Sequence, residues 1–203
     1  MKLFLDPNQP LYTCIEESCY HCDVEKDLNC HFNIKQLLTF LVAAFSVFIV
    51  AGIGIYSFKP IFLVPWVLFI ILYFGVIEIR VMCSHCPHYA EPETDTLKCW
   101  ANYGSPKLSK YRPGPMSMGE TIVFFAGLIF IFVYPYPFLL ISKNTLLLIL
   151  YSIVALIGIF FLRKFLCSRC MNFACPLNRV DNNIRSKFFK HNPEIKNAWD
   201  ENF

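Results

Sequence analysis

Four stretches of the chain contain no charged residue, and they constrain the fold more than any other feature of the sequence. They are Leu37–Tyr56, Ile61–Ile77, Thr121–Ser142 and Thr145–Leu162, with lengths of 20, 17, 22 and 18 residues. A helix needs about 20 apolar residues to cross a hydrocarbon core of about 30 Å. The stretches are continuously apolar and do not alternate, which favours helices over barrel strands. The sequence therefore predicts an all-α integral membrane protein with four transmembrane helices.

Composition argues against the alternative that these stretches are buried helices of a large soluble protein. Of 203 residues, 56% are hydrophobic and only 16% are charged. Too little polar chain remains to cover four such helices. No cleavable signal peptide is expected, because the apolar run Leu3–Leu5 is much shorter than the about 7–15 residues of a signal core. The first transmembrane helix is expected to act as the insertion signal.

The basic residues are unevenly distributed and predict an orientation. Of 18 Lys and Arg, only Lys59 and Lys143 lie in the two short turns between paired apolar stretches. The other 16 lie in the N-terminal segment, the central loop and the C-terminal tail, or at the helix ends next to them. Four helices place those three segments on one face. The positive-inside rule predicts that this face is cytoplasmic, in a multi-pass protein of the cell membrane with both termini in the cytoplasm. Bases beside lipid headgroups explain the positive charge, and no nucleic-acid partner is expected.

These features divide the chain into five segments. They are an N-terminal Cys-rich metal-binding segment (1–35), transmembrane hairpin 1 (36–80), a Cys-containing cytoplasmic loop (81–119), transmembrane hairpin 2 (120–164) and a Cys-rich cytoplasmic tail (165–203). Residues 192–203 at the end of the tail are polar, and we expect them to be mobile or bound to a partner. Pro135 and Pro137 in the third apolar stretch predict a kink or an early end of the regular helix.

An offset of 84 residues relates the two hairpins. It places Cys83-Ser84-His85-Cys86 on Cys167-Ser168-Arg169-Cys170, Arg80 on Lys164 and Lys59 on Lys143. Apolar similarity alone does not produce such a match. It predicts two copies of one unit, consisting of a helix, a tight turn, a second helix and Cys-Ser-x-Cys, related by an axis along the membrane normal. The two cysteine pairs would then meet at the cytoplasmic end of the bundle.

All ten cysteines lie outside the apolar stretches, in an N-terminal group, a central group and a tail group. In a reducing cytoplasm, grouped thiols favour metal binding over disulfides. A Cys-x-x-Cys turn brings two thiolates to one metal, and two such turns supply a tetrahedral sulfur set. Buried or palmitoylated cysteine remains the alternative for one or two of them.

The strongest candidate ligands are the two Cys-x2-Cys pairs that the repeat relates to each other. The remaining cysteine of each half is an alternative ligand or part of a third pair. The candidate cofactor ligands are Cys83, Cys86, Cys99, Cys167, Cys170 and Cys175. Proline follows Cys86 and Cys175, as it often follows the last ligand of bacterial ferredoxin runs, and this favours an iron–sulfur cluster over zinc. The tail spacing Cys-x2-Cys-x4-Cys departs from those runs, so a bacterial ferredoxin fold is not expected.

The N-terminal group reads Cys14-x4-Cys19-x2-Cys22-x7-Cys30. Its first three cysteines resemble the C-x4-C-x2-C loop of plant-type [2Fe–2S] ferredoxins, over about nine residues. The rest of that fold does not fit into the segment before the membrane, and the fourth cysteine comes too soon. We predict a four-thiolate metal site and leave its metal open. The adjacent histidines, which are commoner as polar surface residues than as replacement ligands, are His21, His31, His85 and His88.

Glu78 lies about one turn from the predicted cytoplasmic border of the second helix. One interpretation is a proton-linked carboxylate near a quinone or substrate. The favoured interpretation is an acid at the membrane surface that pairs with Arg80 or Lys164.

The chain has no nucleotide-binding motif, no Ser/His/Asp order and no Gly-rich phosphate loop, so no catalytic residue is assigned and a self-contained enzyme is disfavoured. The leading hypothesis is a membrane-bound iron–sulfur subunit of a redox complex. It would transfer electrons between a cytoplasmic-side partner and a quinone or another membrane subunit. One alternative is a zinc-stabilised membrane scaffold or assembly protein without a redox role. Another is a membrane thiol–disulfide oxidoreductase. The predicted cytoplasmic location of the thiols argues against it.

Overall fold

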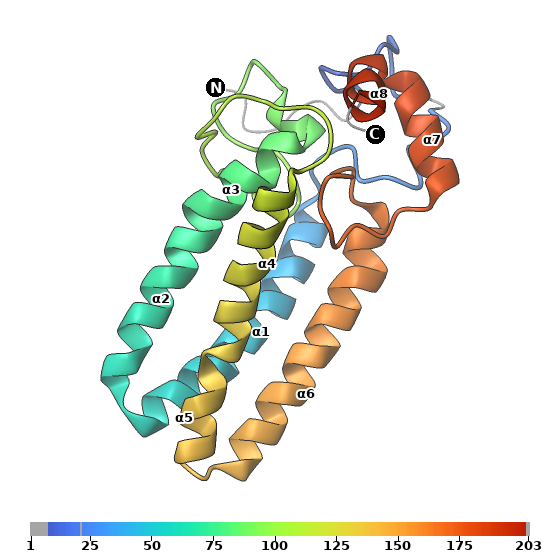
Figure 1. The fold of residues 1–203 in the computed structure, drawn as a ribbon. Coiled ribbons are helices and arrows are strands. Elements are labelled where there is room, and N and C mark those ends of the chain that lie inside the picture. Colours follow the sequence, from blue (N-terminus) through green and yellow to red (C-terminus); the bar gives the residue numbers. More distant parts are fainter. Residues whose placement is uncertain (1–7, 21, 202–203) are drawn as a thin grey trace.

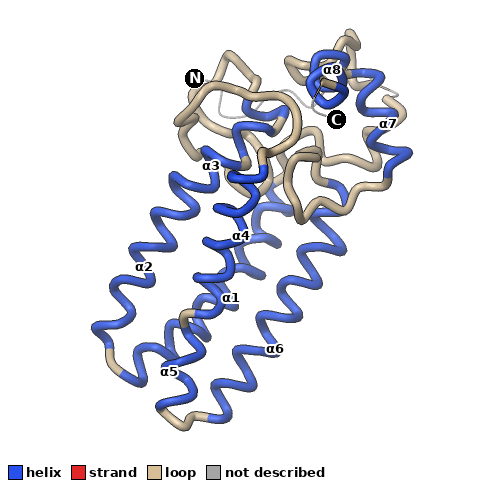
Figure 2. The backbone as a smooth tube through the Cα atoms, viewed as in Figure 1, coloured by secondary structure: helices blue, strands red, loops and turns tan. Residues whose placement is uncertain are grey.

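Four long apolar helices run side by side in the computed structural model, which describes residues 8–20 and 22–201 (Figure 1). Their spans are Ile34–Phe58, Pro60–His85, Met118–Ile141 and Thr145–Arg169. Each span has 24 to 26 residues and is apolar enough to cross a membrane. Each span also covers one of the predicted apolar stretches, apart from the last residue of the third, Ser142, so the all-helical class and the four helices able to span a membrane are confirmed. Within the described ranges there is no strand, only one isolated bridge between Thr96 and Pro106 (Figure 2).

The first hairpin begins with α1 (Ile34–Phe58), whose first turn is capped by the side chain of Asn33. The second span is a continuous helix of changing pitch. Its parts are a 3-10 turn (η1, Pro60–Phe62), α2 (Leu63–Leu72), a π turn (η2, Tyr73–Ile77), α3 (Glu78–Val81) and a 3-10 turn (η3, Cys83–His85). The last two parts extend the helix beyond its 17-residue apolar run, so the helix that contains the shortest of the four stretches is still long enough to span a membrane.

The second hairpin begins with α4 (Met118–Val133), which starts at a capping box formed by Ser117 and Glu120. The helix is interrupted at Tyr134 and continues as α5 (Pro135–Ile141). The interruption confirms the predicted effect of the prolines, because a proline ring clashes with the preceding helical turn and supplies no N–H donor. The fourth span consists of α6 (Thr145–Phe161), a π turn (η5, Leu162–Leu166) and a 3-10 turn (η6, Cys167–Arg169).

Buried aromatic side chains join the helices of the bundle. The Trp66 indole N–H donates to the carbonyl of Ile131 at 3.0 Å, and the Tyr73 hydroxyl donates to the carbonyl of Phe124 at 2.7 Å. Both side chains are almost fully buried. Their polar atoms are satisfied by helix carbonyls, as an apolar environment requires.

The outer surface of the bundle is apolar. Leu, Ile, Val and Phe side chains on α1, α2, α4 and α6 are exposed along the lengths of these helices, and examples are Val42, Ile71, Ile129 and Leu156. A water-exposed surface of this kind would be unfavourable over so large an area. The bundle surface therefore fits contact with lipid.

The two short turns and the cysteine-containing segments lie at opposite ends of the bundle (Figure 1). The cysteine end also carries α7 (Asn182–His191) and α8 (Pro193–Asp200). Ile195 and Trp199 on α8 are buried, so the expectation of a mobile tail is wrong for residues 192–201, whereas partner binding stays a prediction. The apolar residues of α8 recur at i and i+4, and this periodicity gives the short helix one face to bury.

A hydrophobic cluster separate from the bundle holds the cysteine end together. It contains residues from the N-terminal segment, the central loop, the tail, α7 and α8, and its buried members are Leu11, Val24, Leu28, Cys86, Met171, Phe173, Phe188, Ile195 and Trp199. The N-terminal segment therefore folds against the tail rather than as an independent unit.

Candidate metal centre

The first Cys-x2-Cys pair lies in the 3-10 turn that ends the second span. The backbone N–H of Cys86 donates to the carbonyl of Cys83 at 2.9 Å. The hydroxyl of Ser84 donates back to the carbonyl of Arg80 at 2.7 Å. Cys83 and Cys86 are both buried, so this turn holds two thiols close together in a dry environment.

The second pair lies in a turn of the same kind at the end of the fourth span. The backbone N–H of Cys170 donates to the carbonyl of Cys167 at 3.4 Å, and the hydroxyl of Ser168 donates to the carbonyl of Lys164 at 2.6 Å. A π turn precedes each 3-10 turn. The serine of Cys-Ser-x-Cys therefore makes the same backbone contact in both halves.

Asn102 brings a third thiol to the first pair. Its backbone N–H donates to the sulfur of Cys99 at 3.2 Å, and its side-chain amide donates to the sulfur of Cys83 at 3.2 Å. Amide groups that donate to sulfur stabilise a thiolate and modify the properties of a metal bound to it. No sequence motif marks Asn102, although it lies three residues after Cys99 in a turn-rich loop.

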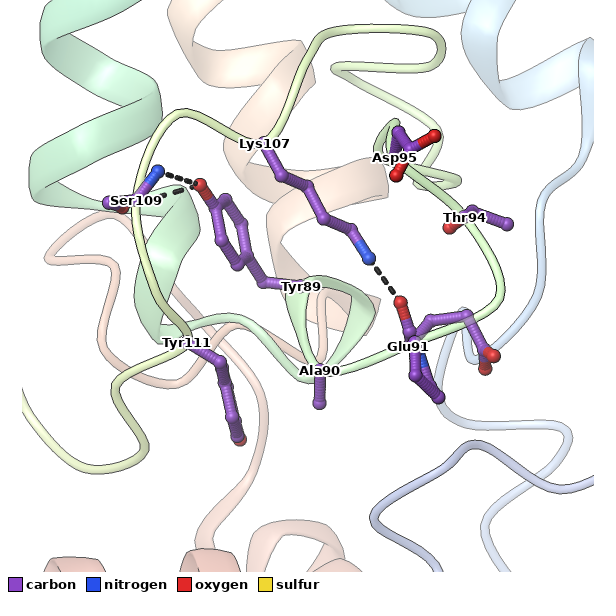
Figure 3. A pocket seen from close by; sticks show the side chains of 9 residues that line it. Tyr89, Ala90, Glu91, Thr94, Asp95, Lys107, Ser109 and Tyr111 are labelled. Atoms are coloured by element: carbon purple, nitrogen blue, oxygen red, sulfur yellow. Dashed lines mark hydrogen bonds between the residues drawn. The ribbon is translucent and has the colours of Figure 1, made fainter.

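The loop that carries Cys99 is closed by contacts around Tyr89 (Figure 3). The backbone N–H of Ser109 donates to the Tyr89 hydroxyl at 2.7 Å, and the Lys107 ammonium donates to the carbonyl of Glu91. A polar pocket of about 270 Å³ opens between these residues, and no cysteine lines it. We interpret the pocket as part of the support of the loop and not as part of the thiol site.

Asn172 connects the two halves directly. Its side-chain amide donates to the carbonyl of Met82, the residue before Cys83, at 3.2 Å. Next to it, Met171 belongs to the same hydrophobic cluster as Cys86. The segment between Cys170 and Cys175 therefore packs on the first cysteine turn. We call the six cysteines of the two halves, which are Cys83, Cys86, Cys99, Cys167, Cys170 and Cys175, the thiol layer.

Electrostatic interactions indicate that thiols of both halves are near one another. Burial raises the pKa of Cys86, and the thiolates of Cys99 and Cys175 raise it further. Burial also raises the pKa of Cys170, with further contributions from Cys86 and Cys175. The pKa of Cys175 is raised to about 12, mainly by burial and then by Cys167. Several buried thiols cannot ionise side by side without a compensating cation, and a bound metal supplies that charge.

The spacing of the sulfurs bears on the type of metal. Among the described residues, which include all ten cysteines, no three cysteine sulfurs lie within 4.8 Å of one another. A tetrahedral zinc site with Zn–S bonds of about 2.3 Å holds its sulfurs about 3.8 Å apart. An iron–sulfur cluster contains several iron atoms, so its ligating sulfurs are farther apart. Three thiols close enough together for one zinc ion are therefore not preformed in the described part of the chain.

The four N-terminal cysteines, Cys14, Cys19, Cys22 and Cys30, form a second group. The pKa of Cys30 is raised to about 12 by burial and by the thiolates of the other three. The Cys19 sulfur lies 3.4 Å from the His31 Nε2, so His31 is directed at a thiol. The backbone N–H of Asn29 donates to the carbonyl of Arg169 at 2.8 Å, which attaches this group to the second cysteine turn. His21 lies outside the described residues.

The other candidate histidines and Glu78 differ from expectation. His85 and His88 are buried and are not surface residues, and His85 lies 3.5 Å from Glu120. Glu78 is 8% exposed, and its Oε2 has no hydrogen-bond partner. Among the described residues it forms no ion pair, whereas Arg80 is exposed. The expected pairing of Glu78 with Arg80 or Lys164 is therefore wrong.

Comparisons of the chain with protein-family models, with curated proteins and with solved structures gave no match. The chemistry of the thiols, and not a fold analogy, must therefore indicate the function.

Proposed function

We propose that the chain is an iron–sulfur subunit of a membrane redox complex, and that it transfers electrons between a partner at the cysteine end and a quinone or another membrane subunit. The observation that supports this most strongly is the hydrogen bond from Asn172 to Met82. It links the two cysteine-bearing segments at one end of a bundle long enough to span a membrane.

The cluster ligands come from the thiol layer. The two turns share their 3-10 geometry and their serine contacts at an offset of 84 residues, which supports the proposal that the hairpins are repeats. The thiolate of Cys175 contributes to the raised pKa values of Cys86 and Cys170, one from each half. Its position supports a role as a ligand beside the two pairs. The prolines after Cys86 and Cys175 favour a cluster over a single zinc ion.

A groove between α1 and α6 supports a quinone as the acceptor. The groove has a volume of about 600 Å³ and is lined by Leu38, Thr39, Val42, Ala43, Ser46, Val154, Ile157, Gly158 and Phe161. It is apolar, and its two hydroxyls, those of Thr39 and Ser46, donate to the carbonyls of Lys35 and Val42 in their own helix. Leu38 and Phe161 lie at the ends of their helices that face the thiol layer. A ring with an isoprenoid tail fits such a surface, because most of its lining is apolar.

The predicted orientation places the thiol layer in the cytoplasm and both termini on the same side, in the cell membrane. The positive-inside rule supports this, since 16 of 18 basic residues lie at the cysteine end or in the segments attached to it. A membrane-impermeant thiol reagent applied to intact cells tests the orientation. Labelling only after permeabilisation is expected, and rapid labelling of intact cells would reverse it.

Metal analysis of anaerobically purified protein tests the proposed function. We expect iron and acid-labile sulfide in similar amounts, with absorption near about 400 nm from the cluster. The variants C86A and C170A should each lose this absorption, because the proposed cluster takes ligands from both halves. The control S57A, whose serine lies at the far end of the bundle, should retain it.

Three outcomes of the iron, sulfide and zinc measurement separate the hypotheses. Iron and sulfide that depend on both cysteine turns support the redox subunit. Zinc without iron would overturn it in favour of the zinc-stabilised scaffold. Metal-free protein that forms stable disulfides between the cysteines of the thiol layer would overturn it in favour of a thiol–disulfide oxidoreductase.

A further inference from the structure

A cluster of three different donor atoms lies where the N-terminal segment meets the end of α7. The Cys22 sulfur, a carboxylate oxygen of Asp23 and a ring nitrogen of His191 all lie within 4.8 Å of one another. Cys22 and His191 are half-buried and Asp23 is exposed. Thiolate sulfur, imidazole nitrogen and carboxylate oxygen are the three protein donors that bind zinc.

The second nitrogen of His191 provides independent evidence for a ligand site. The His191 Nε2 is 2.8 Å from Asp23 Oδ1, and the Nδ1 is 2.8 Å from Glu16 Oε1. A histidine that binds a metal through one nitrogen almost always donates its other ring N–H to a carboxylate or carbonyl. Glu16 occupies that position, so the histidine ring is already oriented with Nε2 toward the Asp23 carboxylate.

Backbone and side-chain contacts around the cluster hold its segments together without a metal. The backbone N–H of Ile15 donates to the carbonyl of His191 at 2.9 Å, and the Thr13 hydroxyl donates to Asn192 Oδ1 at 2.8 Å. Lys187, one turn earlier on α7, lies 3.9 Å from Asp23. The N-terminal segment is thus attached to α7 on both sides of the three donors. A cation would therefore bind to a largely preformed site, and ordering of the chain would cost little of the binding free energy.

A simple ion pair accounts for only part of this arrangement. A protonated His191 between Glu16 and Asp23 explains the two short contacts, but such a pair has no need of a thiol. The Cys22 sulfur nevertheless lies in the same cluster, and it is also close enough to Cys14, Cys19 and Cys30 to raise their pKa values. A divalent cation explains all four side chains at once.

We propose that Cys22, Asp23 and His191 bind a zinc-type divalent cation, and that Glu16 orients His191. This inference rests on the proposed metal binding by the N-terminal cysteines and adds a ligand from α7. The cation replaces the proton of the Cys22 thiol and any proton shared between His191 and Asp23, and these protons pass to solvent. Water or a neighbouring thiol occupies the fourth position. The metal would fasten the N-terminal segment to the tail.

The test uses the full-length protein in detergent, with zinc affinity measured by competition with a chromogenic chelator. H191A and D23N should each weaken zinc binding by about 10-fold or more, and E16Q should weaken it by about 10-fold, the lower end of the effect of an outer-shell partner. E17Q is the matched control, because Glu17 is an exposed neighbour outside the cluster. It should bind zinc like the unmodified protein.

X-ray absorption at the zinc edge gives a second readout. Mixed sulfur, nitrogen and oxygen scattering is expected, and H191A should lose the imidazole contribution. Unchanged zinc affinity in H191A together with all-sulfur scattering would overturn this inference while leaving metal binding by the N-terminal cysteines intact. Failure of the unmodified protein to bind zinc at residues 14–30 would overturn both. Because the mutated side chains are exposed or half-buried, unchanged circular dichroism is expected to show that each variant folds.

Discussion

The side-chain amide of Asn172 donates a hydrogen bond to the backbone carbonyl of Met82 across 90 positions of sequence, at a distance of 3.2 Å. Asn172 lies between Cys170 and Cys175, and Met82 immediately precedes Cys83. Asn172 is only 4% exposed, so the bond forms in a dry region, where an unpaired carbonyl is costly. It fixes how the second cysteine segment sits on the first.

Replacement of Asn172 tests the importance of this contact. N172A should lower stability by about 0.5–1.5 kcal/mol, the net contribution of one hydrogen bond, and should lower the metal content of the thiol layer. Thermal unfolding in detergent and metal analysis measure the two effects. N183A is the control, because Asn183 is exposed on α7. Full metal content in N172A would show that the two cysteine segments meet without this bond.

Asn102 should influence the reduction potential of a cluster in the thiol layer. Its side-chain amide donates to the Cys83 sulfur, and a donor to sulfur stabilises the more negative, reduced cluster. N102A should therefore lower the potential, by about 20–60 mV if the bond contributes 0.5–1.5 kcal/mol to a one-electron couple. Redox titration followed by electron paramagnetic resonance measures it. An unchanged potential in N102A would mean that Cys83 is not a cluster ligand.

Gly127 allows α4 to approach the second span closely. A Cβ atom at this position would lie 2.0 Å from Cε2 of Tyr73, and Tyr73 is fully buried with its hydroxyl held by Phe124. Because the ring cannot move aside, G127A should destabilise the bundle by about 1–3 kcal/mol. G119A, on the same helix and with no atom within 4 Å of the added Cβ, should be near neutral. Thermal unfolding in detergent compares them.

The groove between α1 and α6 can be narrowed with little effect on the helices. Ser46 lines the groove and is exposed, so S46F should fill part of it. We expect quinone binding to weaken by about 10-fold or more, because a packed site tolerates added volume poorly, while metal content stays unchanged. Binding of a short-chain quinone measured by fluorescence quenching checks this. I49F, at an exposed position outside the groove, is the control, and equal quinone binding in S46F would exclude the groove.

The sequence was sufficient to predict the four helices, because their charge-free stretches are read directly from the residues. It also indicated where Pro135 would interrupt the third span. Contacts such as Asn172 with Met82 could not be predicted, since asparagine has no periodic pattern and the contact joins segments 90 positions apart. Glu78 was misjudged for a related reason. Position near a helix end suggested a surface acid, whereas the loop carrying Asn102 packs over that end and buries it.

The tail shows a different limit of sequence reasoning. Residues 192–203 are polar on average, and average composition predicted mobility. The spacing of Ile195 and Trp199 was the informative feature, because two apolar residues one turn apart after Pro193 suffice to bury one face of a short helix. His191 was missed as well, because its partners Glu16 and Asp23 are far away in the sequence.

The π turns before the two cysteine pairs affect the direction in which the thiols point. In these turns the N–H of Glu78 donates to the carbonyl of Tyr73, and that of Cys167 to the carbonyl of Leu162, five residues back. Each such turn inserts one residue into the winding, and one residue corresponds to about 100° of rotation around a helix axis. The side of each helix that faces lipid can therefore stay the same while the cysteine turn at its end is rotated around the helix axis. Deleting one residue from either turn would leave the lipid-facing stripe intact and point that pair of sulfurs away from its counterpart.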